Sequence, residues 1–151
     1  MLSLLVVDIS MDQGANGPNR YRSGSMDFDR PVLRSVDVEL GDSVIVSVVL
    51  EVEGKEHHGR AEGAAHHSAR ARVVGEATLR ALESVTGSAR FELSAVGTST
   101  MDGVTIALVQ VAEPSRPDVY VGSALIRQGD MVLATARAVL DALNRRLTLI
   151  R

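Results

Sequence analysis

The hydrophobic pattern is clearest near the carboxy terminus, where Asp130 to Leu147 predicts an amphipathic helix. Apolar side chains recur there at steps of three, four or one residue: Val132, Ala136, Val139, Leu140, Leu143 and Leu147. They form one wide apolar face at the 3.6-residue period, and that face must lie on a flat surface. Beside it runs a second stripe, Ala134, Ala138 and Ala142. Its small side chains let another helix or a sheet approach closely.

Residues 33–87 predict three strands and a helix. Val36, Val38 and Leu40 alternate with acidic residues and predict a strand with one wet face, which Gly41-Asp42 ends in a turn. The run from Val44 to Val52 is apolar at nearly every position, as expected of a strand covered on both faces.

After a turn at Gly54, Lys55 to Ala61 predicts a more polar strand, ending in the glycines Gly59 and Gly63. A helix is predicted from Ser68 to Thr86, with Ser68 as the N-cap and Gly87 as the residue after its last turn.

The same plan repeats in residues 89–149. Strands are predicted at 91–96, 104–111 and 119–126, with an Asp102-Gly103 hairpin turn, before the helix described above. Gly59-Arg-Ala matches Gly122-Ser-Ala, and Ala77-Thr-Leu-Arg-Ala-Leu matches Ala138-Val-Leu-Asp-Ala-Leu. The sequence therefore predicts an α+β fold, an internal repeat of two βββα units with antiparallel sheets and two packed helices.

The amino-terminal segment, residues 1–32, is predicted to lie outside this single domain of residues 33–151. Leu4 to Ile9 reads as a short apolar strand, and Ser10 to Arg30 as a mobile linker, because it is rich in glycine and polar residues. Two interpretations stay open: a disordered tail, or a linker that lets the strand pair with a sheet edge, on this chain or on a partner subunit.

Composition and charge narrow the function. The chain has 151 residues, no cysteine and no tryptophan, a net charge of −3, and arginines that are scattered along it. Disulfides and thiol catalysis are thus excluded, and the lack of a basic stripe or stacking aromatics argues against nucleic acid binding. The apolar amino-terminal run is too short for a membrane span or signal peptide, so we expect a cytoplasmic protein that does not bind a membrane.

The second half carries a motif of a known family. Ala134, Arg137, Ala138, Ala142, Asn144 and Arg145 stand at the spacing Ala-x-x-Arg-Ala-x-x-x-Ala-x-Asn-Arg, after a strand containing Gly122 and Ala124. This pattern resembles the carboxy-terminal regulatory and dimerisation domain of 2-isopropylmalate synthase and citramalate synthase. In the first half, Gly59-Arg-Ala61-Glu-Gly63-Ala64 is similar to that family's glycine-rich turn, although alanine replaces the second glycine of each pair.

The resemblance covers roughly residues 33–148. It implies two βββα units, a homodimer, and an amino acid or small carboxylate effector bound at the strand-to-helix turns. It does not extend to the family's catalytic barrel and so implies no synthase activity. The corresponding ligand-binding candidates in this chain are Gly59, Ala61, Gly63, Ala64, Gly122 and Ala124. The alternative is that these glycines serve only turn geometry and tight packing.

Four histidines bracket the first glycine turn, at positions 57, 58, 66 and 67. Imidazoles can bind zinc, but adjacent strand residues point to opposite faces, so we expect solvent-exposed histidines and no metal site. No nucleophile motif or phosphate loop is present, and we expect neither enzymatic activity nor a cofactor. The predicted function is a non-enzymatic regulatory and dimerisation domain. The alternative is a ligand-free scaffold that binds another protein through its amino-terminal arm and dimer surface.

Overall fold

The computed structural model describes residues 3–8 and 30–150. The elements follow in the order β1 (Ser3–Asp8), β2 (Val32–Leu40), β3 (Ser43–Val52), β4 (Lys55–Ala64), α1 (His67–Thr86), β5 (Glu92–Met101), β6 (Val104–Ala112), β7 (Val119–Leu125) and α2 (Met131–Ile150). The predicted fold class is confirmed: each half contains a three-stranded antiparallel meander followed by a helix.

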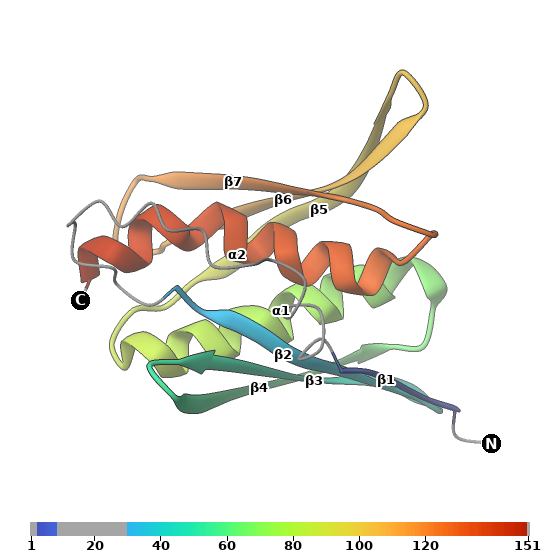
Figure 1. The fold of residues 1–151 in the computed structure, drawn as a ribbon, viewed down its shortest axis with the longest axis horizontal. Helices are drawn as coiled ribbons and strands as arrows, with labels where there is room; N and C mark the ends of the chain where they lie inside the picture. The colour runs from blue at the N-terminus through green and yellow to red at the C-terminus, as the bar shows by residue number, and fades with distance from the viewer. Residues whose placement is uncertain (1–2, 9–29, 151) are drawn as a thin grey trace, which may run out of the picture.

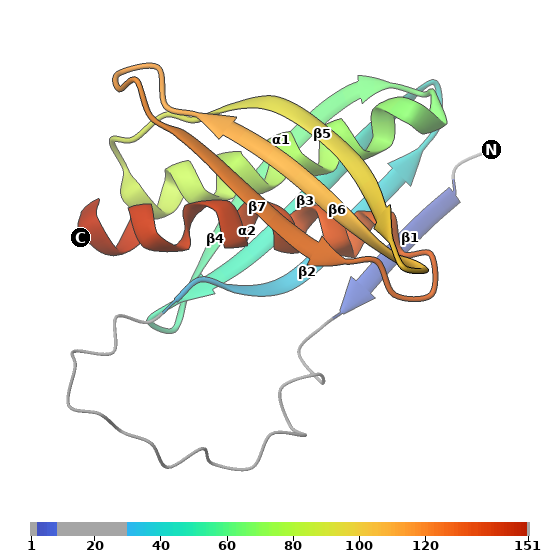
Figure 2. The ribbon, with the colours of Figure 1, turned by 90° about the horizontal axis from the view of Figure 1, so that it is seen from above.

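The two helices lie side by side between two sheets (Figures 1 and 2). The first sheet has the strand order β1-β2-β3-β4 and the second the order β5-β6-β7. Helix α1 packs mainly on β3 and β4, α2 mainly on β6 and β7, and the two helices also contact each other. Each sheet therefore has an inner face that contacts a helix and an outer face that no other helix or strand of the described chain covers.

Strand β1 pairs antiparallel with β2 of the same chain, from Ser3 opposite Leu40 to Asp8 opposite Ser35. Of the two interpretations left open by the sequence, the structure agrees with the one in which the amino-terminal strand pairs with a sheet edge. This pairing gives the first sheet a fourth strand. The predicted linker lies outside the described residues except for Arg30.

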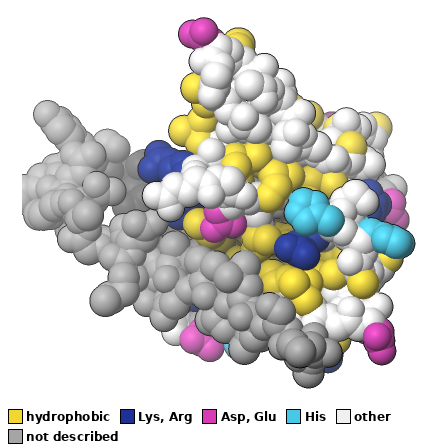
Figure 3. Space-filling model, turned by 90° about the vertical axis from the view of Figure 1, so that its right-hand side faces the viewer, with side chains coloured by type: hydrophobic (Ala, Val, Ile, Leu, Met, Phe, Trp, Pro, Cys, Tyr) yellow, Lys and Arg dark blue, Asp and Glu magenta, His cyan; other side chains and the backbone are white. Residues whose placement is uncertain are grey.

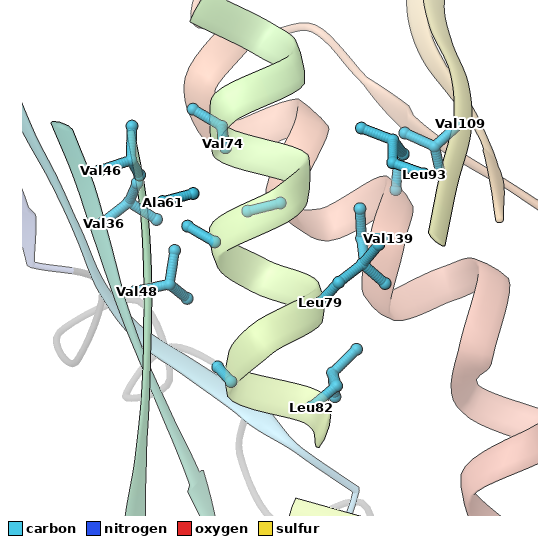
Figure 4. Close-up of a cluster of buried hydrophobic side chains, with 14 of the residues drawn as sticks. Val36, Val46, Val48, Ala61, Val74, Leu79, Leu82, Leu93, Val109 and Val139 are labelled. Carbon is cyan, nitrogen blue, oxygen red and sulfur yellow. The ribbon is translucent and has the colours of Figure 1, made fainter. Parts of the chain in front are cut away.

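The core fills the space between the sheets with aliphatic side chains (Figure 4). Val46 and Val48 point from the first sheet toward α1, Leu79 and Val139 meet between the helices, and Val109 faces them from the second sheet. The apolar helix face predicted from the sequence is buried apart from Leu140, which is half-buried, and the alanine stripe of α2 is buried as well.

One predicted burial pattern is wrong. Val44 to Val52 was expected to be covered on both faces, but in β3 buried residues alternate with half-buried ones such as Ile45, Ser47 and Val49. The reason is that both helices pack inside, so no second helix layer covers the outer face of this strand.

Turns and helix ends follow local chemistry. Glu53-Gly54 and Asp102-Gly103 both have positive φ angles, as two-residue hairpins require. Gly87 ends α1 in the left-handed conformation, and its N–H donates to the carbonyl of Glu83 at 2.8 Å, as predicted. Ser68 is not the N-cap: α1 begins one residue earlier, after His66, without a side-chain cap.

Candidate functional site

The structure places Gly59 and Gly122 under the helices, in the middle of β4 and β7. A Cβ atom at Gly59 would lie 2.0 Å from the carbonyl oxygen of Ala77, and one at Gly122 would lie 2.0 Å from that of Ala138. The sequence-based placement of these two glycines at strand-to-helix turns is therefore wrong. Both let a strand backbone touch a helix backbone, which is the close approach that the alanine stripe predicted.

The six ligand-binding candidates do not form one cluster, because they lie on two different sheets. On β4, Ala61 is buried against the core, a Cβ atom on Gly63 would meet the side chain of Val73, and Ala64 is exposed at the strand end. On β7, Ala124 is half-buried opposite Ala107. Of the six, only Gly63 and Ala64 stand near a strand-to-helix connection.

Two clefts run along the outer edges of the helices instead. The α1 cleft has a volume of about 520 Å³ and is lined by Arg72, Glu76, Leu79, Arg80, Glu83, Arg90, Phe91, Glu92, Leu93 and Pro114. The α2 cleft has a volume of about 480 Å³ and is lined by Arg30, Val121, Asp141, Ala142, Asn144 and Arg145.

The two clefts occupy equivalent places in the internal repeat. Arg90, Arg80 and Glu83 of the α1 cleft match Arg30, Asp141 and Asn144 of the α2 cleft, at offsets of sixty or sixty-one positions. The two clefts thus share three related positions, of which one keeps its arginine and two differ in charge.

A buried ion pair fixes the end of α2 to the loop after β6. The guanidinium of Arg146 donates two hydrogen bonds of 2.8 Å to the carboxylate of Glu113, which is 3% exposed. Tyr120 donates a third hydrogen bond to the same carboxylate at 3.1 Å. The Arg146 hydrogen bonds hold the pKa of Glu113 below its usual range, and burial raises the pKa of Tyr120. Because the carboxylate is fully engaged, this pair is a structural clamp.

The histidines do not converge on a common point. His57 lies 3.4 Å from the hydroxyl of Ser84 and His58 lies 3.4 Å from Glu56, whereas His66 and His67 are exposed. Figure 3 shows histidine side chains at the surface at the end of the molecule where β4 connects to α1. Among the residues that the structure describes, no three metal-ligating side chains come together.

The outer face of the second sheet is apolar. Its strands alternate inward and outward, so the outward positions are Val119, Val121, Ser123 and Leu125 on β7, Val104, Ile106, Leu108, Gln110 and Ala112 on β6, and Ala95, Gly97, Ser99 and Met101 on β5. We call this set the apolar sheet face; Figure 2 looks onto it. The large apolar side chains that are most exposed all belong to it, with Val121 at 67% and Met101 at 72%.

The outer face of the first sheet has a different character. Its strands β2 and β4 carry mainly charged and polar residues at outward positions, with Asp37 and Glu39 on β2 and Glu56, His58, Arg60 and Glu62 on β4. The central strand β3 adds Ser43, Ile45, Ser47, Val49 and Glu51. Such a charged face is what a sheet exposed to water normally shows. The contrast between the two sheets marks the apolar face as a candidate interaction surface.

No protein-family model matches the chain, and no curated protein is significantly similar to it in sequence. In residues 3–8 and 30–150, no helix combines the length and the apolar character that crossing a membrane requires. The resemblance to the 2-isopropylmalate synthase regulatory domain thus rests on the motifs quoted above.

Proposed function

We propose that this chain is a non-enzymatic homodimerisation domain of the regulatory type, acting in the cytoplasm. The observation that carries the proposal is the apolar sheet face. A monomer that exposes a contiguous apolar surface of this kind gains free energy by covering it. The partner we propose is a second copy of the chain.

The size of the face suits a modest dimer. Neighbouring strands lie about 4.8 Å apart and rise about 3.3 Å per residue, so the three-stranded sheet measures roughly 14 by 25 Å. With its side-chain relief such a face exposes on the order of 600 Å², so two copies would bury on the order of 1,200 Å², the lower end of specific interfaces. We therefore expect a dissociation constant in the micromolar range.

The chemistry of the face also suits a second copy. A two-fold interface brings the same patch on both subunits together, so any charge on it would meet its own copy. The outward positions of β6 and β7 carry no charge, and Glu92 stands only at the start of β5, on the edge of the sheet. Self-association therefore meets little like-charge repulsion.

A lysine in this face tests the proposal. Val121→Lys places a charge on the apolar sheet face, and we expect it to weaken dimerisation about a hundredfold or more, because a buried unpaired charge costs several kcal/mol. The matched control is His58→Lys, which introduces the same side chain at the equivalent position of the first sheet. Sedimentation equilibrium measures both dissociation constants. A wild-type chain that stays monomeric at high micromolar concentration, or equal weakening by both variants, refutes the proposal.

The regulatory part of the proposal is that a small amino acid or carboxylate effector binds one dimer arrangement more tightly than another, as differential affinity requires. The α1 and α2 clefts support it, because a ligand can reach them from solvent. Gly59 and Gly122, by contrast, are covered by the helices.

A ligand-free scaffold is the second candidate, and it is favoured by one observation. Among the described residues β1 is an edge strand that pairs with β2, so its other edge could receive an extended segment of another protein. Deleting residues 1–30 would then abolish partner capture and leave self-association through the apolar sheet face intact.

A further inference from the structure

We propose that the α1 cleft binds a small organic oxyanion, a carboxylate or phosphate group on an apolar body. Arg80 and Arg90 would hold the anionic group, and Leu79 and Phe91 would contact the apolar body. For its biological role this inference rests on the regulatory part of the proposed function. Binding itself can be measured independently of dimerisation.

The walls of the α1 cleft are held in place by side chains that bond to backbone. The carboxylate of Glu83 accepts a hydrogen bond of 2.9 Å from the N–H of Phe91, which fixes the connection between α1 and β5. Arg72 donates a hydrogen bond of 2.9 Å to the carbonyl of Leu93 and forms an ion pair of 3.2 Å with Glu76. A cleft whose walls are already fixed loses little conformational entropy when a ligand binds.

The lining carries three arginines and three glutamates, and these same contacts engage one of the arginines and two of the glutamates. Glu76 is engaged by Arg72, and Glu83 by the backbone of Phe91. Arg80 is exposed, and Arg90 donates a hydrogen bond of 3.0 Å to the carbonyl of its neighbour Ala89.

Within the described chain, neither Arg80 nor Arg90 forms a salt bridge with a carboxylate, and Glu92 is the remaining acid of the lining, exposed at the start of β5. Two guanidinium groups offer planar, paired N–H donors, which suit a carboxylate or phosphate.

The equivalent α2 cleft has a different lining. In the α2 cleft, Asp141 stands in the place of Arg80, and its carboxylate accepts a hydrogen bond of 2.9 Å from the N–H of Ser123. An uncharged amide, Asn144, stands in the place of Glu83. The α2 cleft also carries two cations, Arg30 and Arg145, but its apolar lining is limited to Val121 and Ala142. An oxyanion with an apolar body should therefore choose the α1 cleft.

The floor of the α1 cleft indicates that the anion is organic. Leu79, Phe91 and Leu93 are 3%, 6% and 5% exposed, and Pro114 adds a further apolar wall. A volume of about 520 Å³ lies within the usual range for small-molecule sites. Inorganic phosphate would leave this apolar surface in contact with water, so an anion with an apolar body should bind more tightly.

Titration with defined probes, followed by amide chemical shifts, tests the site. The probes are benzoate, phenyl phosphate, inorganic phosphate and the cation benzylamine. We expect benzoate or phenyl phosphate to shift the amide signals of Phe91 and Leu93, and to bind more tightly than inorganic phosphate. Whichever of the two binds more tightly identifies the anionic group. Benzylamine should leave both signals in place.

Arg80→Gln and Arg90→Gln should each weaken binding of the organic anion about tenfold, because each variant loses the hydrogen bonds that the charged guanidinium donates to the anion. The control is Arg60→Gln, which removes the same charge from the exposed outer face of β4 and should change nothing. The inference falls if no organic anion moves the Phe91 and Leu93 signals at millimolar concentration. It falls too if Arg60→Gln weakens binding as much as Arg80→Gln, or if inorganic phosphate binds as tightly as phenyl phosphate.

Repeating the titration on Val121→Lys separates this inference from the proposed dimer. Unchanged binding by that variant assigns the site to a single chain, as proposed. Binding that disappears together with dimerisation would place the site in the dimer interface and overturn the α1 cleft as its location. A monomeric wild-type chain that binds benzoate would refute the dimer and leave the cleft site intact.

Discussion

Replacing Gly122 by alanine should loosen the contact between β7 and α2. The added Cβ atom would lie 2.0 Å from the carbonyl oxygen of Ala138 and 2.4 Å from the amide nitrogen of Ala142. Both are backbone atoms, so no side-chain rotation relieves the clash, and the helix must move outward by about 1 Å to restore normal contact. Overpacking of this kind costs about 3 kcal/mol, which for a chain of this length lowers Tm by roughly 6–12 °C.

Thermal unfolding followed by far-ultraviolet circular dichroism measures this effect, with Gly97→Ala as the control. Gly97 also lies within a strand, but nothing lies within 4 Å of a Cβ atom built on it. That variant should be neutral or slightly stabilising, because alanine lowers the entropy of the unfolded chain. Gly59→Ala should behave like Gly122→Ala. If Gly122→Ala unfolds within 2–3 °C of Gly97→Ala, roughly the shift expected for 1 kcal/mol, the assigned backbone contact is wrong.

Four further outcomes can be tested. Arg146→Met leaves the buried carboxylate of Glu113 unpaired and should cost about 3 kcal/mol in urea unfolding at pH 7; a loss below 1 kcal/mol would contradict the clamp. Since the folded pKa of Glu113 is held below its ordinary value of 4.5, the stability from this pair is complete above that value and is lost as pH falls through the folded pKa. The difference between wild type and Arg146→Met should therefore narrow in acid. The side chain of Asp130 accepts a hydrogen bond from the N–H of Leu133 at 3.0 Å, so Asp130→Ala should cost about 1 kcal/mol, measured by the same unfolding. Zinc or EDTA should leave Tm unchanged, and a shift of several degrees on chelation would show a metal site.

Much of the fold could be predicted because both halves repeat the same local signals. The apolar face and the alanine stripe of α2 were readable from side-chain spacing, and both are buried. Gly59 and Gly122 match each other in the sequence, which also leaves tight packing open as their role. Their position in the middle of a strand could not be predicted, because a glycine before a helix suggests a turn until the length of the strand is known. The strands run past both glycines, to Ala64 and Leu125.

The parts that sequence reasoning missed depend on contacts between distant residues. Glu113 and Arg146 are separated by thirty-three positions, and in the sequence each looks like an ordinary surface charge. The α1 cleft joins residues of α1, β5 and the loop at Pro114, and no spacing rule relates these segments. The sequence did contain one signal for the apolar sheet face. Val119 and Val121 fill outward positions of β7, whereas its inward positions hold small or weakly polar residues, so the larger aliphatic side chains face outward.

The two halves of the internal repeat can be compared to test whether folding requires the apolar sheet face. The inner faces of β4 and β7 are similar in the two halves, because Gly59 and Gly122 make the same close approach to the helix backbone. The outward positions beside them differ: His58 and Arg60 on β4 are replaced by Val121 and Ser123 on β7. The first half shows that this meander packs its helix with a charged outer face, so folding does not require an apolar one. An exposed apolar face that folding does not require supports our proposal of self-association, because its uncharged chemistry suits a second copy of the chain.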